Sequence, residues 1–542
     1  MTLFDRILAA RGLSAESKAA FLYPKYELTY DPFLLNDMAK AVDRLVIAHK
    51  KREKIVIYGD YDIDGLTATS LLFDAFSRFG FKNVEFFIPN RFDEGYGLTT
   101  DAIDNFARSG SKLVVTVDCG STSEKEINHA NDLGLDIIVT DHHDCMGKHV
   151  PAIAVINPKY DGNKYPFVDL SGVGVAFKLV QALQTKLKGI PDGHEKWLLD
   201  LVALGTVCDV VQLKDENRIF VYFGLQVLAK TKRLGLRALM AVSGVESEKI
   251  DTRSLGYRLG PRMNAAGRLE TAKHTMDMLL SNDPMVALKK AEYLDDLNRS
   301  RRLEQDKIFK QAAIQAERYG DDPVLVVSGA DWNHGIVGIV ASKLLEKYKK
   351  PTFVLQEIGD ESKGSARSYG DFSVIKAINS AKNLITKGGG HKMAVGITLP
   401  TKNIDKFRKK VNDFYRKQNY KNQHLLLLPN ADATAGLDEI TEDLLKQISK
   451  LEPFGIGNPQ PIIRCDDLEV LKIKKMGADS QHVKLDLADK SGRTMQFLSF
   501  NAPDSCFVEI GSIVSVWFYP NINEWRGIRS VEGQILHIES KA

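Results

Sequence analysis

Cysteines and long apolar runs are scarce in this sequence, and their scarcity excludes whole classes of protein. The chain has 542 residues and only five cysteines. These lack both the density of a disulfide-rich secreted domain and the paired CxxC spacing of structural zinc, so we expect reduced thiols and a cytoplasmic location. No apolar run is long enough to cross a bilayer, and the N-terminal MTLFDRILAARGLS lacks the apolar core of a signal peptide. We therefore expect no membrane association.

An excess of either charge is also lacking. Lysine and arginine total 73 against 70 for aspartate and glutamate, which gives a formal net charge of +3. This balance does not by itself indicate nucleic-acid binding, which would have to depend on local basic patches. The length predicts roughly three or four domains. A hydrophobic content of 44% is sufficient for substantial cores.

What the sequence does contain is a set of apolar segments that end in acidic residues. Three of them, residues 54–60, 112–118 and 135–141, are rich in β-branched residues and nearly continuous in apolar character. Such segments are typical of parallel strands that helices cover on both faces. Helical patterns, for example at residues 66–80, lie between them, so we predict a doubly wound parallel sheet. Ligands of such sheets bind beyond the carboxyl ends of the strands.

The residues at these ends have the chemistry of a metal site. Acidic residues alternate within GDYDIDG, which we expect to form a tight turn that leads into a helix at Gly65. Adjacent histidines follow the third strand, and a fourth apolar segment, residues 201–213, is predicted to be another strand that ends near Asp209. Carboxylate and imidazole ligands together suit Mn²⁺, with Mg²⁺ as the alternative, and two such ions would serve an in-line displacement at a phosphoester. The candidate residues are Asp60, Asp62, Asp64, Asp118, Asp141, His142, His143 and Asp209.

Four of these motifs, DYDIDG, VDCG, DHH and CDVV, resemble in type and order those of the DHH phosphoesterase superfamily, which includes family II pyrophosphatases, nanoRNases and RecJ exonucleases. Four later segments are similar to RecJ signatures, namely LGPRMNAAGRLE at 259–270, WNHGIVGIVASKL from Trp332, GSARS at 364–368 and GGGHKMAVG at 388–396. The ordered set covers most of the chain. By this resemblance the sequence is identified as a member of the RecJ family.

The resemblance implies roles for the residues of the first motifs. The implied ligands of two divalent metal ions are Asp62, Asp64, Asp118, His142 and Asp209. His143 would contact the scissile phosphate or assist the reacting water, and Asp141 would orient an imidazole. Asp60 is left open as a further ligand. Family II pyrophosphatases carry a histidine ligand where this chain has Tyr58, which argues against pyrophosphate as the substrate.

A second group of residues is predicted to bind phosphate. Arginine forks grip phosphate oxygens at two points, and glycines let backbone N–H groups approach a phosphate. Such residues follow an apparent strand in IPNRFDEGYG, occur in LGPRMNAAGR, which we expect to be a glycine-containing loop, and recur in GSARS and GGGH. By resemblance they hold the DNA backbone or its terminal 5′ phosphate. They are Arg91, Arg262, Asn264, Arg268, Ser365, Arg367 and His391.

The predicted fold class is α/β, with a parallel-sheet DHH catalytic domain joined by a long helix to a second α/β (DHH-associated) domain, followed by a β-rich OB-fold domain. The expected boundaries are 1–45 for an N-terminal helical segment, 46–215 for the catalytic domain, 216–318 for a helical region with the long connecting helix, 319–420 for the DHH-associated domain and 425–542 for the OB-fold. Aromatic residues of the last domain, Trp517, Phe518, Tyr519 and Trp525, are candidates either for base stacking or for the barrel core.

The predicted function is that of a 5′-to-3′ exonuclease specific for single-stranded DNA, which releases 5′ mononucleotides by two-metal-ion catalysis in DNA repair and recombination. Single-strand-binding protein and a helicase are expected as further partners, and the monomer is the family expectation. Two other functions are kept as alternatives: a phosphodiesterase for short oligonucleotides or cyclic dinucleotides, and a catalytically silent replication scaffold. At the level of the site, Cys119, Cys145 and Cys208 lie close to the acids and leave a zinc site as an alternative. Single aspartates at strand ends are also common as helix caps and turn residues.

Overall fold

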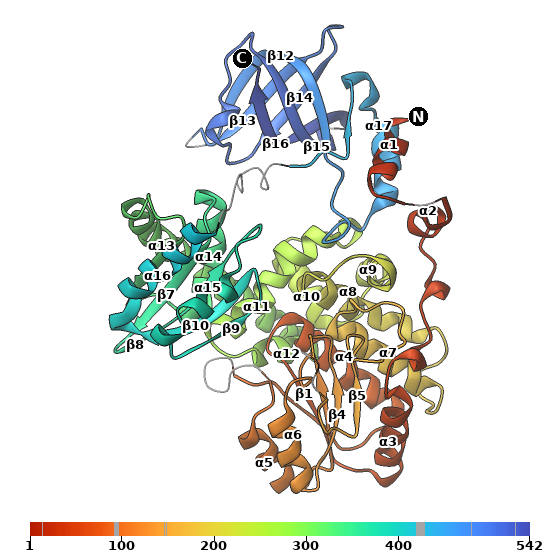
Figure 1. Ribbon diagram of the computed structural model, residues 1–542. Coiled ribbons are helices and arrows are strands. Elements are labelled where there is room, and N and C mark those ends of the chain that lie inside the picture. The colour runs from red at the N-terminus through yellow and green to blue at the C-terminus, as the bar shows by residue number, and fades with distance from the viewer. Residues whose placement is uncertain are drawn as a thin grey trace. The chain divides into compact units, whose positions relative to one another are not determined.

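The structure is a computed structural model that describes residues 1–13, 15–90, 97–145, 147, 149–418, 429–477, 480–525 and 527–541. The chain divides into two compact units. Figure 1 labels their helices and strands. The first contains Met1–Gly260, Met278–Pro284 and Pro429–Ala542, and the second contains Pro261–Asp277 and Met285–Leu428. No helix among the described residues is both long and apolar enough to span a membrane.

The first unit contains a parallel sheet of five strands in the order β2-β1-β3-β4-β5, so the predicted parallel sheet is confirmed. Helices α5 and α6 pack on one face, against a core that includes Val56, Tyr58 and Val139, while α3, α4 and α7 pack on the other. The strand order reverses between β1 and β3, which makes the carboxyl ends of these two strands the expected ligand-binding point. The strands are β1 Ile55–Gly59, β2 Val84–Phe87, β3 Leu113–Val117, β4 Asp136–Thr140 and β5 Ala154–Ile156.

A group of helices completes this part of the chain. They are α1 Leu3–Ala10, α2 Ala15–Leu22, α3 Met38–Lys51, α4 Ile63–Phe79, α5 Thr100–Arg108, α6 Glu124–Asp132, α7 Gly172–Gln184, α8 Leu199–Cys208, α9 Asp215–Leu228 and α10 Leu234–Val242. The fourth strand expected within residues 201–213 was wrong, because this segment forms helix α8. Its residues are apolar on all sides because it packs against α4, α7 and α9, and a continuous apolar run does not distinguish a buried helix from a buried strand.

The segment expected to be a glycine-containing loop is also helical. Residues Gly260–Leu269 form α11, which continues from a π-helix at Ser254–Leu259. Pro261 explains the wider turn, because its ring lacks an N–H group and would clash with the carbonyl of Tyr257 in a regular α-helix. The loop expectation for Arg262, Asn264 and Arg268 was therefore wrong.

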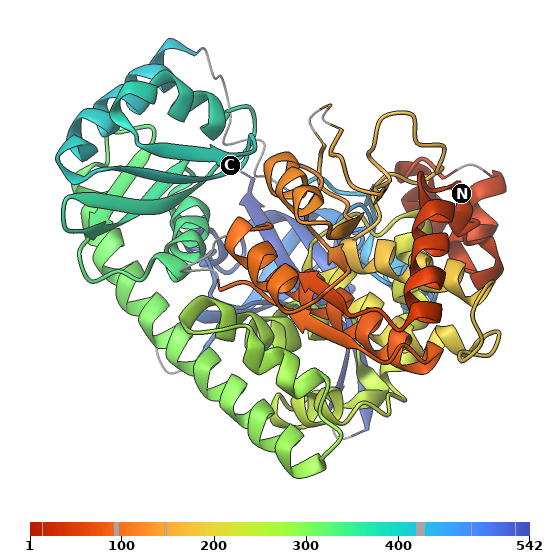
Figure 2. The same cartoon turned by 90° about the horizontal axis from the view of Figure 1, so that it is seen from below.

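The second unit is built on a mixed sheet in the order β6-β7-β8-β10-β9, in which only β6 and β7 are parallel. Its long helix α13, Pro284–Arg318, runs for 35 residues without a break, as predicted, and can be followed in light green in Figure 2. The other elements are α12 Lys273–Leu279, β6 Leu325–Gly329, α14 His334–Tyr348, β7 Thr352–Ile358, β8 Glu361–Arg367, α15 Val374–Ser380, β9 Lys387–Gly390, β10 Ala394–Pro400 and α16 Ile404–Lys417.

The C-terminal segment of the first unit forms a closed β-barrel. Its strands follow the order β12-β13-β14-β16-β15, and β15 pairs back onto β12, while β14 and β16 are parallel. This one-two-three-five-four order with closure is an OB-fold arrangement, and the predicted hairpin of β13 and β14 is confirmed. The elements are β11 Ala433–Thr434, α17 Glu442–Ile448, β12 Ile463–Met476, β13 His482–Ala488, β14 Thr494–Ser499, β15 Ile513–Trp525 and β16 Ile528–Ser540.

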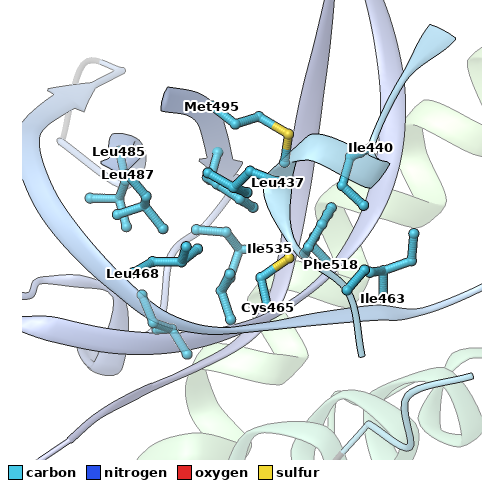
Figure 3. Packing of buried hydrophobic residues seen from close by; sticks show 14 of the residues in the cluster. Leu437, Ile440, Ile463, Cys465, Leu468, Leu485, Leu487, Met495, Phe518 and Ile535 are labelled. Atoms are coloured by element: carbon cyan, nitrogen blue, oxygen red, sulfur yellow. The ribbon is translucent and has the colours of Figure 1, made fainter. Parts of the chain in front are cut away.

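The barrel core takes side chains from both ends of the chain. Leu468, Leu485 and Phe518 point into the same interior (Figure 3), and Phe518 is completely buried. Leu3, Phe4, Ile7 and Leu8 of helix α1 belong to the same cluster. Of the aromatic candidates for base stacking, Phe518 is therefore a core residue, while the side chain of Trp525 lies outside the described part of the chain.

Candidate metal centre and phosphate-binding residues

Four neighbouring strands of the parallel sheet end in polar residues at the same level. The register pairs Gly59 with Val117, Val117 with Thr140, and Thr140 with Ile156. The next residue of each strand is therefore aligned across the sheet, and these residues are Asp60, Asp118, Asp141 and Asn157. Strand register thus brings three predicted site residues, and one that was not predicted, to the edge where ligands bind.

Asp62 and Asp64 belong to the start of helix α4 rather than to a turn before it. Asp62 is the N-cap, and its side chain accepts a hydrogen bond from the backbone N–H of Gly65 at 3.1 Å. The expected role of Gly65 was wrong, because this residue lies inside the first helical turn. A Cβ at Gly65 would lie 2.5 Å from the carbonyl oxygen of Asp60, so glycine is needed here for close packing.

The Asp64 carboxylate is completely buried and is held by the beginning of another helix. Its Oδ2 accepts the backbone N–H of Gly172 at 2.6 Å, and its Oδ1 accepts that of Val173 at 2.9 Å. Both donors belong to the first turn of α7, where free N–H groups and the helix dipole favour an anion.

The two histidines have different surroundings. His143 Nδ1 lies 2.8 Å from Asp141 Oδ1, which also accepts the backbone N–H groups of both histidines. His142 is buried, and its Nε2 lies 3.1 Å from an oxygen of Asp118, 3.5 Å from one of Asp209 and 3.8 Å from one of Asp64. The sheet edge, α4 and α8 thus converge on one imidazole nitrogen.

Asp209 reaches this point from the end of α8, where it is the C-cap. The next residue, Val210, has a φ of 64°, in the left-handed region that β-branched residues rarely adopt, and its side chain is 61% exposed. The chain therefore turns sharply directly after the Asp209 carboxylate.

Three overlapping groups of donors are close enough to hold a metal ion. In each group the ligand atoms lie within 4.8 Å of one another. Asp118 occurs in two groups and His142 in two, so the groups share ligands as a site for neighbouring ions would. The groups are Asp118 with His142 and His143, Asp64 with His142 and Asp209, and Asp60 with Asp62 and Asp118.

The electrostatics of the centre are those of crowded acids. Burial and the charge of Asp62 raise the pKa of Asp64 to about 7, and burial and the charge of Asp64 raise the pKa of Asp209 to about 9. Burial and the same neighbour hold the pKa of Asp118 well above its usual value. Burial alone would raise the pKa of Asp141 too, but its hydrogen bond with His143 and the imidazole charges place it far below the usual value. The pKa of Asp141 is therefore lowered, whereas the pKa values of Asp64, Asp118 and Asp209 are raised.

A divalent metal ion fits these residues. Burial and the neighbouring His143 lower the pKa of His142 to about 3, so its imidazole is neutral, as a metal ligand must be. Its Nε2 is buried and makes no hydrogen bond among the described residues, although it faces three carboxylates. A site that combines this imidazole nitrogen with carboxylate oxygens matches the ligand preferences of Mn²⁺ and also accommodates Mg²⁺.

The predicted phosphate-binding residues lie in the second unit, apart from Arg91, which lies outside the described residues. Arg268 donates from Nη1 to the carbonyl of Gly335 at 3.1 Å. A Cβ at Gly338 would lie 3.1 Å from Arg367 Nη2 and 3.4 Å from Ser365 Oγ. Three of the predicted residues thus surround the first two turns of α14, whose N-terminus favours anions.

The remaining members of the predicted group are placed differently. Arg262 pairs with Asp295 of α13 through Nε at 2.7 Å, whereas Asn264 and Arg268, four residues apart, share one face of α11. His391 follows β9 and is exposed, and its backbone N–H donates to the carbonyl of Ala394 at 2.8 Å. Arg262 therefore contacts α13, and His391 lies exposed beyond the end of β9.

Comparison with known proteins supports the predicted family and domain order along most of the chain. The family model described as "DHH family, N-terminal domain" matches residues 54–206, "DHHA1 domain" matches 321–417, and "RecJ OB domain" matches 431–537. The single-stranded-DNA-specific exonuclease RecJ of Dickeya dadantii is 34% identical over 562 residues, which cover 99% of this chain and 96% of that protein. The chain belongs to the RecJ family of single-stranded-DNA-specific exonucleases.

Other RecJ proteins extend this result. RecJ of Bacillus subtilis is 37% identical over 529 residues, covering 96% of this chain but 66% of its own length, so the chain spans about two thirds of that relative. The crystal structure of Thermus thermophilus RecJ in complex with Mn²⁺ has a TM-score of 0.82 at 25% identity and covers 99% of this chain and 78% of that one. The predicted fold class of DHH, DHH-associated and OB-fold domains is confirmed. Together with the donor set of the centre, these findings support the use of a divalent metal ion.

The sequence analysis missed residues that border the centre. Asn157, at the end of the three-residue strand β5, is buried and donates from Nδ2 to Ser121 Oγ and to the carbonyl of His143. Lys159 is exposed, and its charge acts on both His142 and Asp209. The run INPK after a short apolar stretch is the only sequence signal for them.

The alternative of a zinc site is not favoured by the cysteines. None of the three ligand groups found among the described residues contains a cysteine. The sulfur of Cys119 is directed to the carbonyl of Tyr58 and that of Cys208 to the carbonyl of Leu255.

Proposed function

We propose that this chain hydrolyses single-stranded DNA from its 5′ end and releases 5′ mononucleotides with the help of two divalent metal ions, Mn²⁺ in preference to Mg²⁺, in DNA repair and recombination. The observation that carries the proposal is the buried, neutral Nε2 of His142 facing carboxylates from β3, α4 and α8 in a chain of the RecJ family. A divalent cation bound there would satisfy this nitrogen and the neighbouring acids together.

The residues that would hold the ions are those of the three groups without His143, which is assigned another role. The proposed ligands are Asp62, Asp64, Asp118, His142 and Asp209, with Asp60 as a sixth. When bound, the ions supply a hydroxide near neutral pH and stabilise the charge that develops on the phosphate.

The other residues of the centre orient the groups that would contact the substrate. Asp141 accepts three hydrogen bonds from the His142–His143 segment and one from the backbone N–H of Ser121, so it fixes the imidazole of His143. With Nδ1 held by Asp141, the ring directs Nε2 away from that acid, and we assign this nitrogen to the scissile phosphate or the reacting water. The half-exposed side chain of His143 suits this role better than that of the buried His142.

The second unit would hold the strand. Arg268, Ser365 and Arg367 combine two guanidinium groups and a hydroxyl with the N-terminal turns of α14. This combination favours a phosphate group, and the terminal 5′ phosphate of the strand is the proposed occupant. Arg91, Arg262, Asn264 and His391 are proposed as further contacts to the backbone of the strand.

The setting of the reaction is part of the proposal. We place the protein in the cytoplasm as a monomer, with single-strand-binding protein and a helicase as partners that supply the strand. The cysteines Cys119, Cys145, Cys208, Cys465 and Cys506 are all free thiols, as a reducing compartment would keep them.

The test is a time course with Mn²⁺ on four substrates: a single strand labelled at its 5′ end, the same strand labelled at its 3′ end, the matching duplex and a dinucleotide. Immediate release of labelled mononucleotide from the 5′ end, with the duplex spared, is the expected result. Cleavage of the dinucleotide alone would indicate a phosphodiesterase for short substrates. Cleavage of none of the four, with the strand still bound, would contradict catalysis and indicate a scaffold.

A further inference from the structure

We propose that Gly172 and Gly205 are positioning residues of the metal centre, because the space left by their missing side chains is the space in which the Asp118 and Asp64 carboxylates are held. The inference rests on the proposed function insofar as these carboxylates are taken as metal ligands. It concerns two glycines to which the sequence alone assigned no role.

Neither glycine is required by its backbone conformation. Neither has a φ in the left-handed region, so an alanine could adopt the same backbone angles. Gly205 lies inside helix α8 and Gly172 begins helix α7. A glycine in a helix interior disfavours the helix relative to alanine, so the reason for glycine at these positions must lie in the neighbouring atoms.

At Gly172 the neighbouring atoms are those of a proposed metal ligand. A Cβ there would lie 2.7 Å from Asp118 Oδ1, 2.8 Å from its Cβ and 2.9 Å from its Cγ. Real Cβ atoms do not approach other atoms so closely, so Asp118 would have to move. The N–H of Gly172 also donates to Asp64, so one residue constrains two carboxylates.

At Gly205 three helices meet. A Cβ there would lie 2.7 Å from Val173 Cγ1 of α7 and 2.9 Å from Asp64 Oδ1 of α4, and closer still to the Thr67 hydroxyl. The Asp64 carboxylate is thus bounded by backbone N–H groups of α7 on one side and by the bare Cα of Gly205 on another. Outer partners of metal ligands typically change metal affinity about 10–100-fold when altered.

The test is calorimetric titration of Mn²⁺ into the metal-free full-length chain and its variants. We expect two ions to bind the unaltered chain. Gly205→Ala should weaken the site that contains Asp64 by about 10–100-fold. Gly172→Ala should weaken both sites, because its methyl group displaces Asp118, which belongs to two ligand groups, and its N–H holds Asp64, which belongs to the third. Gly174→Ala is the matched control in the same turn of α7: the nearest neighbours of its Cβ would be Ser171 Oγ at 3.1 Å and Leu170 Cδ2 at 3.5 Å, and none is an atom of Asp64 or Asp118, so it should bind Mn²⁺ normally.

The possible results distinguish a failure of this inference from a failure of the proposed function. Binding within twofold of the unaltered chain by both alanine variants would overturn the inference and leave the proposed function intact. Failure of the unaltered chain to bind Mn²⁺ would overturn both. Should Gly205→Ala fail to fold, the double variant Thr67→Ala/Gly205→Ala removes the hydroxyl that is closest to the new methyl group. With Thr67→Ala alone as its control, this folded double variant should still bind the Asp64-site ion weakly, and normal binding would overturn the inference.

Discussion

At the scale of single residues, Asp118 is, with His142, one of the two donors that belong to more than one ligand group. It follows β3 at the switch in strand order and belongs to two of the three ligand groups. We expect Asp118→Asn to lower cleavage of single-stranded DNA at least about a thousandfold, because it removes a charge that two ions would share. Binding of the strand, measured by fluorescence anisotropy in Ca²⁺, should change little. Asp132→Asn on the exposed end of α6 is the control, and near-normal turnover of Asp118→Asn would contradict the assigned site.

Val210 carries backbone strain beside the same centre. It is the residue after the C-cap of α8, where the left-handed conformation is normally taken by glycine, and an L-residue there costs about 1–2 kcal/mol. Val210→Gly should therefore raise the free energy of unfolding by about 1 kcal/mol, measured by urea denaturation. Lys349→Gly, also at a left-handed position but with an unbranched side chain, should gain less. A lower stability of Val210→Gly would show that the side chain makes contacts worth more than the strain.

Site residues could be predicted from the sequence where a residue of suitable chemistry directly follows a recognisable strand. The acids after the apolar strands and the histidine pair were recognisable from sequence, because parallel strands present their carboxyl ends along one edge. Asn157 and Lys159 were not, because the strand before them is only three residues long. Gly172 and Gly205 were not, because a need for empty space becomes visible only when the atoms that fill its surroundings are placed.

At the scale of elements, strand β8 presents alternate residues to α14. Ser365 and Arg367 are two apart and therefore share a face, on which both lie near Gly338. We expect Arg367→Ala to raise the KM for a 5′-phosphorylated strand about tenfold, with a smaller effect on kcat, because a charge-assisted hydrogen bond is lost from binding. Lys363→Ala removes the same charge from an exposed position of this strand and serves as the control. Equal effects of the two variants would indicate general electrostatic attraction instead of a phosphate contact.

Helix α1 acts as an element of the C-terminal barrel. Ile7 is completely buried among barrel residues, and Arg6 pairs with Glu439. Ile7→Ala should destabilise the barrel by about 2–5 kcal/mol through loss of buried surface and the cavity that remains. Hydrogen exchange should then be faster in β12 to β16 and unchanged in β1 to β5, whereas Ala10→Ser on the exposed side of α1 should have no effect. If hydrogen exchange in β12 to β16 were as slow in Ile7→Ala as in the unaltered chain, the helix would not contribute to the stability of the barrel.

The type of an element was predictable where its pattern was unambiguous. The β-branched strands of the parallel sheet, the long charged helix α13 and the hairpin of β13 and β14 were all recognisable. Helix α8 was not recognisable, because apolar residues occupy all of its faces and its sequence therefore lacks the hydrophobic periodicity of an amphipathic helix. The helix after Leu259 was not, because proline and glycine suggest a loop unless a π-helix accommodates the proline.

At the scale of the whole molecule, metal ions should stabilise the folded chain. The acids of the centre come from β1, β3, α4 and α8, and they form a site only in the folded state. A ligand that binds only the folded state adds about 2.7 kcal/mol at a free concentration of about 100 times its Kd. We therefore expect the Tm to rise with the logarithm of Mn²⁺ concentration and to fall back after chelation, with the far-UV circular dichroism spectrum unchanged. Asp118→Asn should show a much smaller rise, and an equal rise in both proteins would indicate binding elsewhere.

The order of domains along the chain could be predicted, but the packing of α1 could not. Each domain has its own local signals, whereas the contact between residues 3–8 and the barrel joins parts of the chain that are more than 400 residues apart. An amphipathic helix shows that it has a partner without showing which one.

This packing has a consequence for synthesis on the ribosome. Helix α1 leaves the exit tunnel early, but its partner strands, from Ile463 onward, are made more than 450 residues later. At about 5–20 residues per second the apolar face of α1 waits on the order of 20–90 s for its barrel. During that interval the side chains of Leu3, Phe4, Ile7 and Leu8 lack the barrel residues against which they pack in the folded chain.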